Sequence, residues 1–187
     1  MKYRLVRKHL PEMIRQIGYT QVFLNGYVGA GKTTLAQELA EKLKYRLVSL
    51  DPLTYGYTRK TVLKMGYKDQ VAFIQWQLEM IERYDNAVFD RGPVDSIGYA
   101  MALFWKNVQQ WKIWRWYRPH PKQLSVIFMK PVIYRSKAEV ELASLALQYS
   151  IWLITNVWRE LDVVIVDDGK VRIRRRGEWY ESRSTVY

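Results

Sequence analysis

The chain has 187 residues, no cysteine, and 30 lysine and arginine residues against 18 aspartate and glutamate residues, which gives a formal charge of +12. This length suits a single α/β domain, and the lack of cysteine excludes disulfides and thiol chemistry. No segment has the ~20 uninterrupted apolar residues of a membrane span or the apolar run of a signal peptide, so we expect a soluble cytoplasmic protein that does not enter a membrane.

The first part of the chain predicts a strand, a glycine loop and a helix in that order. A short helix over residues 11–17 comes first. Residues 19–24 (YTQVFL) then form an apolar, β-branched and aromatic run that is typical of a strand. Residues 34–43 are good helix formers in which leucine recurs at every fourth position, so we expect an amphipathic helix there.

Residues 26–33 join this strand to this helix and read GYVGAGKT, which matches the phosphate-binding pattern G-x-x-x-x-G-K-[ST]. Glycines let successive N–H groups turn toward a phosphate, and the helix start adds positive potential. We expect Lys32 to be an exposed point charge for the β- and γ-phosphates of ATP, and the Thr33 hydroxyl to bind Mg²⁺. The alternative is a glycine-rich turn before an ordinary helix. The residues expected to bind the nucleotide are Gly26, Tyr27, Val28, Gly29, Ala30, Gly31, Lys32, Thr33 and Thr34.

Strands and helices alternate through the rest of the chain. The remaining strands are expected at residues 45–50, 87–89, 123–129 and 162–166. The remaining helices are expected at residues 68–84, 94–108 and 136–160. This alternation predicts a three-layer α/β P-loop NTPase fold, in which helices flank a five-stranded parallel sheet and ligands gather at the carboxyl ends of its strands.

We interpret residues 1–187 as one domain with a core at about 19–167. The basic extension, residues 168–187, includes a candidate β-hairpin over residues 171–180 that turns near Gly177.

Charged residues follow two of the predicted strands. Asp51 stands before Pro52 at the end of the second strand, where it could accept a proton from an acceptor hydroxyl or help position a metal; a turn-starting aspartate is the alternative. Asp90 closes the third strand, a place typical of a residue that holds Mg²⁺, and Arg91 suits phosphate or acceptor recognition. Motor-type ATPases usually carry Asp-Glu at this point, so no water-activating residue is evident here.

The phosphate loop, Asp51 and the run FDRGPVDSIGYA at residues 89–100 together resemble the nucleoside and nucleotide kinase group of P-loop proteins, which includes thymidylate kinases and deoxynucleoside kinases. The run itself is more similar to the AAA-like ATPase family that contains ribosylnicotinamide kinase domains. The resemblance covers about residues 21–167 and implies ATP and Mg²⁺ as cofactors.

The sequence departs from this group at two places. The group usually has glutamate where Asp51 stands, and its arginine-rich lid is shortened here to residues 134–137. Arg135 is our candidate for the lid residue, and a solvated arginine at a helix start is the alternative.

Two basic segments have no role in this scheme. Residues 105–121 place four tryptophans among lysines and arginines. Such a segment could stack single-stranded bases and hold their phosphates, or it could cover an apolar face or a subunit contact while the basic side chains reach solvent. The basic arm at residues 172–176 is open to the same two interpretations, a solvated hairpin arm or a polynucleotide contact.

The sequence therefore predicts an ATP- and Mg²⁺-dependent phosphotransferase that acts on a nucleoside, nucleotide or related small acceptor. Its expected catalytic residues are Lys32, Asp51, Arg91 and Arg135, and its expected metal ligands are Thr33 and Asp90. The alternatives are a nucleic-acid-associated P-loop ATPase and a polynucleotide 5′-hydroxyl kinase. Partners would be a nucleoside triphosphate and the acceptor, with nucleic acid and a second copy in a homodimer as further candidates.

Overall fold

A single mixed β-sheet organises the fold of the computed structural model, which describes residues 4–27, 29–62, 64–130, 136–167 and 170–182. Within these residues the sheet has the strand order β2-β3-β1-β4-β5-β6-β7. The strands are β1 (Gln21–Gly26), β2 (Arg46–Ser49), β3 (Ala87–Asp90), β4 (Gln123–Phe128), β5 (Asp162–Asp167), β6 (Lys170–Arg175) and β7 (Glu178–Ser182). The first five pair in parallel, and β6 and β7 continue the sheet antiparallel, so the predicted parallel core and terminal hairpin are both confirmed.

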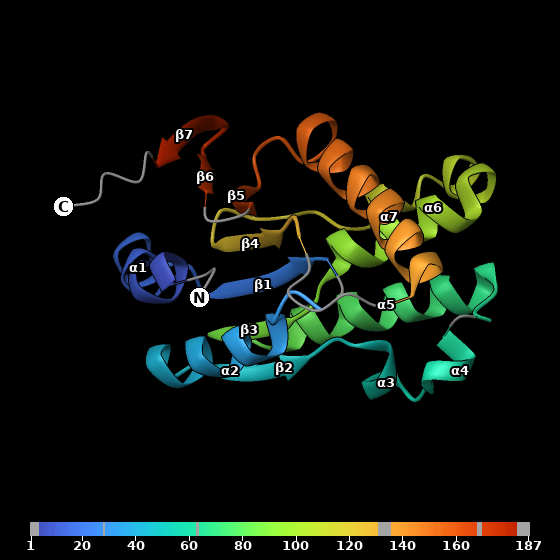
Figure 1. The fold of residues 1–187 in the computed structure, drawn as a ribbon, viewed down its shortest axis with the longest axis horizontal. Helices are drawn as coiled ribbons and strands as arrows, with labels where there is room; N and C mark the ends of the chain where they lie inside the picture. The colour runs from blue at the N-terminus through green and yellow to red at the C-terminus, as the bar shows by residue number, and fades with distance from the viewer. Residues whose placement is uncertain (1–3, 28, 63, 131–135, 168–169, 183–187) are drawn as a thin grey trace.

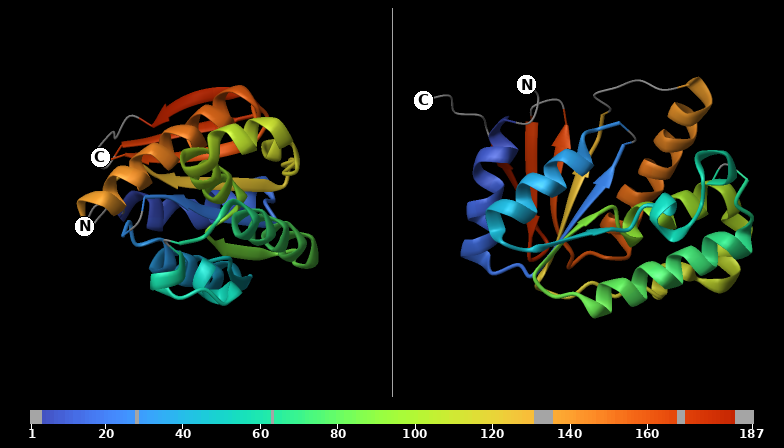
Figure 2. Two further views of the ribbon diagram at one scale, coloured as in Figure 1. Left: turned by 90° about the vertical axis from the view of Figure 1, so that its right-hand side faces the viewer. Right: turned by 90° about the horizontal axis from the view of Figure 1, so that it is seen from below.

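Helices cover both faces of the sheet (Figures 1 and 2). They are α1 (Arg4–Ile17), α2 (Lys32–Leu43), α3 (Pro52–Tyr55), α4 (Arg59–Val62), α5 (Tyr67–Arg83), α6 (Pro93–Trp111), the 3₁₀ turn η1 (Ile113–Arg115) and α7 (Lys137–Asn156). The right-handed crossover from β1 to β2, at the edge of the sheet, places α2 on one face. The crossovers from β2 to β3, β4 and β5 run in the opposite direction and place α5, α6 and α7 on the other face. Helix α1 packs beside α2, and α6 packs along α7. Strands β1, β3 and β4 are buried along their whole length, as a covered parallel sheet requires.

The first helix is longer than the predicted residues 11–17, because α1 begins at Arg4 and contains Pro11 in its interior. Proline has no N–H to donate to the carbonyl four residues earlier, that of Arg7. The Lys42 side chain on α2 reaches this carbonyl at 3.4 Å, and buried Leu10 and Ile14 hold the helix to the core. Contact with α2 therefore supports a helix that the local sequence alone does not indicate. The short helices α3 and α4 were also not predicted.

Arg174 corrects the interpretation of residues 172–176 as a uniformly solvated arm. It is buried, and its guanidinium donates to the carbonyls of Ile154 at 2.9 Å, Trp158 at 2.8 Å and Leu161 at 2.9 Å. These carbonyls lie at and just beyond the end of α7, where a helix leaves backbone acceptors without partners. The hairpin thus anchors α7 through Arg174, while Arg172 on the same strand is exposed.

We expect Arg174→Met to destabilise the fold by about 2–4 kcal/mol, because it leaves several buried carbonyls without a charged donor. For a chain of this size the melting temperature should fall by on the order of 10 °C in thermal circular dichroism. Arg172→Met removes the same charge from an exposed position and should change it by less than about 2 °C. Equal melting temperatures for the two variants would contradict the anchoring role.

Across the part of the chain that the structure describes, no helix is both long and apolar enough to cross a membrane. The cytoplasmic location and the homodimer stay predictions.

Candidate active site

The phosphate loop connects β1 to α2 at the carboxyl end of the sheet, and its glycines adopt the conformations that the motif requires. Gly26, Gly29 and Gly31 have φ of 102°, 74° and 79°, in the region that side chains disfavour. Gly26 also faces β4 closely, since a Cβ there would lie 2.3 Å from the carbonyl oxygen of Phe128. No other residue fits at Gly26 without moving the backbone of β4.

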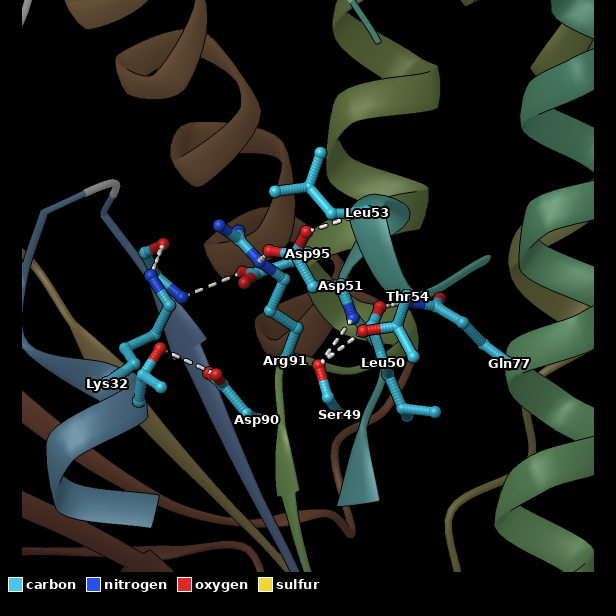
Figure 3. A network of polar contacts seen from close by, with 12 residues as sticks. Lys32, Ser49, Leu50, Asp51, Leu53, Thr54, Gln77, Asp90, Arg91 and Asp95 are labelled. Carbon is cyan, nitrogen blue, oxygen red and sulfur yellow. Dashed lines mark hydrogen bonds and ion pairs between the residues drawn. The ribbon is translucent and has the colours of Figure 1, made fainter. Parts of the chain in front are cut away.

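Lys32 is not exposed, contrary to the prediction from sequence. Its residual exposure is 5%, and Nζ donates to the carbonyl oxygen of Gly26 at 2.9 Å (Figure 3) and to that of Tyr27 at 2.6 Å. The side chain folds back over the loop because these carbonyls offer the ammonium group its partners. The pKa of Lys32 is lowered to about 8: burial is the largest cause, Arg91 adds to it, and nearby carboxylates, that of Asp95 foremost, oppose both effects. The amine is therefore a poorly solvated donor already held within the loop.

The two expected metal ligands are in contact. The Thr33 hydroxyl donates to Asp90 Oδ2 at 2.6 Å, which brings the first turn of α2 to the end of β3 (Figure 3). Mg²⁺ in phosphate-transfer sites is held by one or two side-chain oxygens together with water and substrate phosphates. A hydroxyl and a carboxylate beside a phosphate loop fit that requirement, so Thr33 and Asp90 are the residues that would hold the ion.

Asp51 and Arg91 form an ion pair beside the loop. Arg91 Nε lies 2.5 Å from Asp51 Oδ2, and Asp51 Oδ1 accepts from the Leu53 amide at 2.9 Å (Figure 3). Asp51 is thus both the N-cap of α3 and the partner of Arg91, so the turn-forming alternative describes only one of its oxygens. Burial lowers the pKa of Arg91, but the carboxylates of Asp51 and Asp95 outweigh this effect and leave it raised.

Arg91 has a backbone conformation that is rare for a residue with a side chain. Its φ is +79°, and its amide donates to the Leu24 carbonyl on β1 at 3.1 Å. Strained residues of this kind persist where the surrounding structure holds them, often at functional sites. The turn after β3 therefore directs the guanidinium toward Asp51 at the cost of local strain.

An aromatic cluster lies next to Asp51 along the chain. The ring of Tyr55, on α3, is 5.6 Å from that of Phe73 and 5.1 Å from that of Trp76, both on α5. The Tyr57 ring stacks on Tyr55 at 5.6 Å. These residues were not singled out from the sequence, because they come together only when α3 packs on α5.

Asp95 is a site residue that sequence reasoning missed, although it lies in the run at residues 89–100. Its Oδ1 accepts from the Gly26 amide at 2.8 Å, and the side chain is buried (Figure 3). Burial raises the pKa of Asp95, while Lys32, the hydrogen bond from Gly26 and Arg91 oppose this effect. The only signal for Asp95 in the sequence is that it belongs to this run, because an aspartate in the first turn of a helix is common for reasons of the helix dipole.

The structure describes only some of the remaining residues that were expected at the site. Val28 and Arg135 lie outside the described residues. Tyr27 is buried, and its hydroxyl donates to the Val140 carbonyl at 3.0 Å and hydrogen-bonds with the Ser144 hydroxyl at 2.7 Å, which ties the loop to α7. Ala30 is also buried, and Thr34 lies on the first turn of α2. A role for any of these residues in nucleotide binding stays a prediction.

Comparison with known proteins supports the fold. A sequence model of the family described as AAA domain matches residues 21–183. Structures of deoxyadenosine kinase from M. mycoides are similar: one with products dCMP and a flexible dCDP bound has a TM-score of 0.57 at 15% identity, and covers 79% of this chain and 90% of that chain. Those with dCTP and dATP bound have TM-scores of 0.55 and 0.53 at 14% and 17% identity, and cover 79% of this chain and 90% and 91% of theirs. No curated protein matches the sequence significantly.

Proposed function

The chain belongs to the AAA domain family of P-loop proteins, and from that premise we propose that it is a kinase that transfers the γ-phosphate of ATP, with Mg²⁺, to a hydroxyl group of a nucleoside, nucleotide or related small acceptor. The observation that carries the proposal is the ion pair between Asp51 and Arg91 at 2.5 Å. It stands beside the phosphate loop, where a second substrate would meet the γ-phosphate. A carboxylate and a guanidinium in this place can orient an acceptor hydroxyl and share the charge of the transferring phosphoryl group.

Each residue has a distinct part in this function. The loop amides and Lys32 hold the phosphates, and Thr33 and Asp90 hold Mg²⁺, which when bound neutralises charge on the phosphate oxygens. Asp51 orients the acceptor hydroxyl and takes its proton. Arg91 orients the Asp51 carboxylate through their ion pair and shares the negative charge that develops during transfer.

The similar structures support a nucleoside or nucleotide as the acceptor. They are structures of a deoxyadenosine kinase with dCMP and dCDP, dCTP or dATP bound. The aromatic cluster of Tyr55, Tyr57, Phe73 and Trp76 follows Asp51 along the chain, and its half-buried rings, those of Tyr55, Tyr57 and Trp76, supply flat apolar surface of the kind that planar bases favour.

A screen with ATP labelled at the γ-phosphate tests this function. Nucleosides, nucleoside monophosphates, DNA with 5′-hydroxyl ends and water alone would be compared as acceptors with Mg²⁺ present. We expect label to appear on a nucleoside or nucleotide much faster than as inorganic phosphate. Release of inorganic phosphate at the same rate with and without every acceptor would contradict a kinase and favour an ATPase.

A second candidate function, binding of single-stranded nucleic acid, rests on the basic aromatic segment. Residues 96–138 contain eight lysines and arginines and no aspartate or glutamate. Trp111 is 61% exposed and Trp116 is 37% exposed, beside exposed Lys112 and Arg115. Aromatic rings that alternate with cations match the alternation of bases and phosphates along a single strand.

The turn that carries these side chains is firmly anchored. Ile113 and Tyr117 are buried in the core, and the Trp158 indole donates to the Trp114 carbonyl at 3.3 Å. Trp105 has a packing role instead, since its ring stacks on that of Tyr149 at a centroid distance of 5.2 Å. The nucleic-acid interpretation of the segment therefore rests on Trp111 and Trp116, whereas Trp105 fits the packing interpretation.

Titration with oligodeoxythymidylate tests the second candidate. We expect binding at low salt whose affinity falls steeply as salt rises, because cations that neutralise phosphates release condensed counterions. Trp111→Ala should weaken binding about tenfold through the loss of one stacked base. Trp152→Ala, which removes an exposed tryptophan from α7, should have no effect. Absence of binding at low salt would remove this candidate.

A further inference from the structure

A buried carboxylate under the phosphate loop, that of Asp95, has no part in the functions proposed above. Asp95 lies on the first turn of α6, and two close approaches fix that turn. A Cβ at Gly92 would come within 2.9 Å of the Phe23 side chain on β1, and one at Gly98 within 2.3 Å of the Ser150 hydroxyl on α7. The start of α6 is therefore held between β1 and α7, and Asp95 has a fixed position.

One oxygen of Asp95 belongs to the structure of the loop. Oδ1 accepts from the Gly26 amide, and the Gly26 carbonyl in turn accepts from Lys32 Nζ (Figure 3). Phe128 blocks movement of Gly26 on the side of β4. Asp95 thus positions the residue on which the Lys32 amine rests.

The other oxygen, Oδ2, is buried and has no hydrogen-bond partner within the described residues. A buried carboxylate is costly unless nearby positive charge offsets the loss of water. Lys32 and Arg91 supply that charge, since both act on Asp95 electrostatically and it acts on both of them. Asp95, Lys32 and Arg91 form one charge group at the loop, to which Asp51 also belongs through its ion pair with Arg91.

We propose that Asp95 is the counter-ion of the empty phosphate loop: its carboxylate balances Lys32, and together with Asp51 it balances Arg91, until the phosphates of a nucleotide bind beside these cations. The inference rests on the proposed function only in that the loop binds nucleotide phosphates. Bound phosphates then face the negative charge of Asp95, which lowers their affinity and favours their release after transfer. Asp95 is a positioning residue, because it acts on the phosphates through Lys32, Arg91 and Gly26.

Asp95→Asn removes the negative charge but keeps the hydrogen bond, because an amide oxygen can still accept from the Gly26 amide. We expect D95N to bind pyrophosphate and ATP about tenfold more tightly than the wild type in titration calorimetry, with the affinity for adenosine unchanged. Asp95→Ala also releases the Gly26 amide, so it should bind pyrophosphate more weakly than D95N. Pyrophosphate binding by folded D95N that is no tighter than that of the wild type would overturn the proposal, and so would equal binding by D95N and D95A.

Asp162→Asn is the matched control. Asp162 is a buried carboxylate at the start of β5, at the opposite end of the sheet from the loop, and it accepts from the Tyr19 hydroxyl at 2.6 Å and the Arg176 amide at 2.8 Å. D162N should lower the melting temperature and leave pyrophosphate affinity within about twofold of the wild type. Tightening by D162N equal to that by D95N would show a general charge effect and overturn the proposal. Asp95→Ser, also neutral, serves the same comparison if D95N does not fold.

Pyrophosphate binding needs no acceptor, so this result is independent of the acceptor screen. If the wild type transfers no phosphate but D95N binds pyrophosphate more tightly than the wild type, only the kinase proposal is contradicted. If the wild type transfers phosphate but D95N binds pyrophosphate no more tightly, only the counter-ion proposal is contradicted.

Discussion

Replacing Lys32 by alanine is expected to lower phosphate transfer by at least 10²–10³-fold, on the order of the effect of removing one charged or polar group from a developing anion. The reason is that the Lys32 amine is the cation already placed within the loop, with its donors on the Gly26 and Tyr27 carbonyls. A phosphate that enters the loop replaces weak carbonyl partners with a charged one. Steady-state transfer from ATP with Mg²⁺ measures the effect.

The same variant should fold. The pKa of about 8 indicates that burial of the Lys32 ammonium group is unfavourable for the folded state. Replacing Lys32 by alanine removes this cost together with two hydrogen bonds. The control is Lys122→Ala, which removes one exposed cation just before β4, at the other end of the sheet. We expect it to keep wild-type transfer. A K32A protein with wild-type turnover would refute the central assignment of the loop.

The fold and half of the site could be predicted because the signals are local. The phosphate loop is one contiguous octapeptide, and the alternation of strands and helices is visible in residue periodicity. The proximity of Asp90 to Thr33, 57 positions earlier, could be predicted because the carboxyl ends of parallel strands meet at one edge of the sheet. These rules place residues at an edge, but they do not say which way each side chain turns.

The features that could not be predicted depend on contacts between distant segments. Asp95 meets Gly26 across 69 positions, and Arg174 reaches carbonyls 13 to 20 positions earlier. In the sequence each is an ordinary charged residue, one at a helix start and one in a basic run. Lys32 is a different case: its position in the motif was evident, but its burial follows from loop carbonyls whose direction only the folded backbone defines.

Asp51→Asn is expected to lower transfer by on the order of 10²–10⁴-fold, the usual contribution of a positioned base. The substitution is selective for the charge. Asparagine is as good an N-cap as aspartate, so the bond from the Leu53 amide and the start of α3 should survive. ATP affinity should change little, because the phosphate loop and the contact between Thr33 and Asp90 are untouched. Transfer rates and ATP binding by calorimetry, measured on the same preparations, separate these effects.

Asp69→Asn is the control for the capping role. Asp69 Oδ2 accepts from the Gly66 amide at 2.9 Å at the start of α5, and among the described residues no arginine pairs with it. It should lose a few tenths to ~1 kcal/mol of stability, because the negative charge near the start of α5 is removed, and no transfer activity. If D51N behaves like D69N, Asp51 is a cap and nothing more. If D51N loses Mg²⁺-dependent ATP binding together with transfer, Asp51 belongs to the metal site, and Arg91 becomes the first residue to test on the acceptor side. If D51N loses transfer but still binds ATP, Asp51 acts on the acceptor hydroxyl. The ion pair between Asp51 and Arg91 at 2.5 Å then orients the carboxylate toward the hydroxyl that attacks the phosphate.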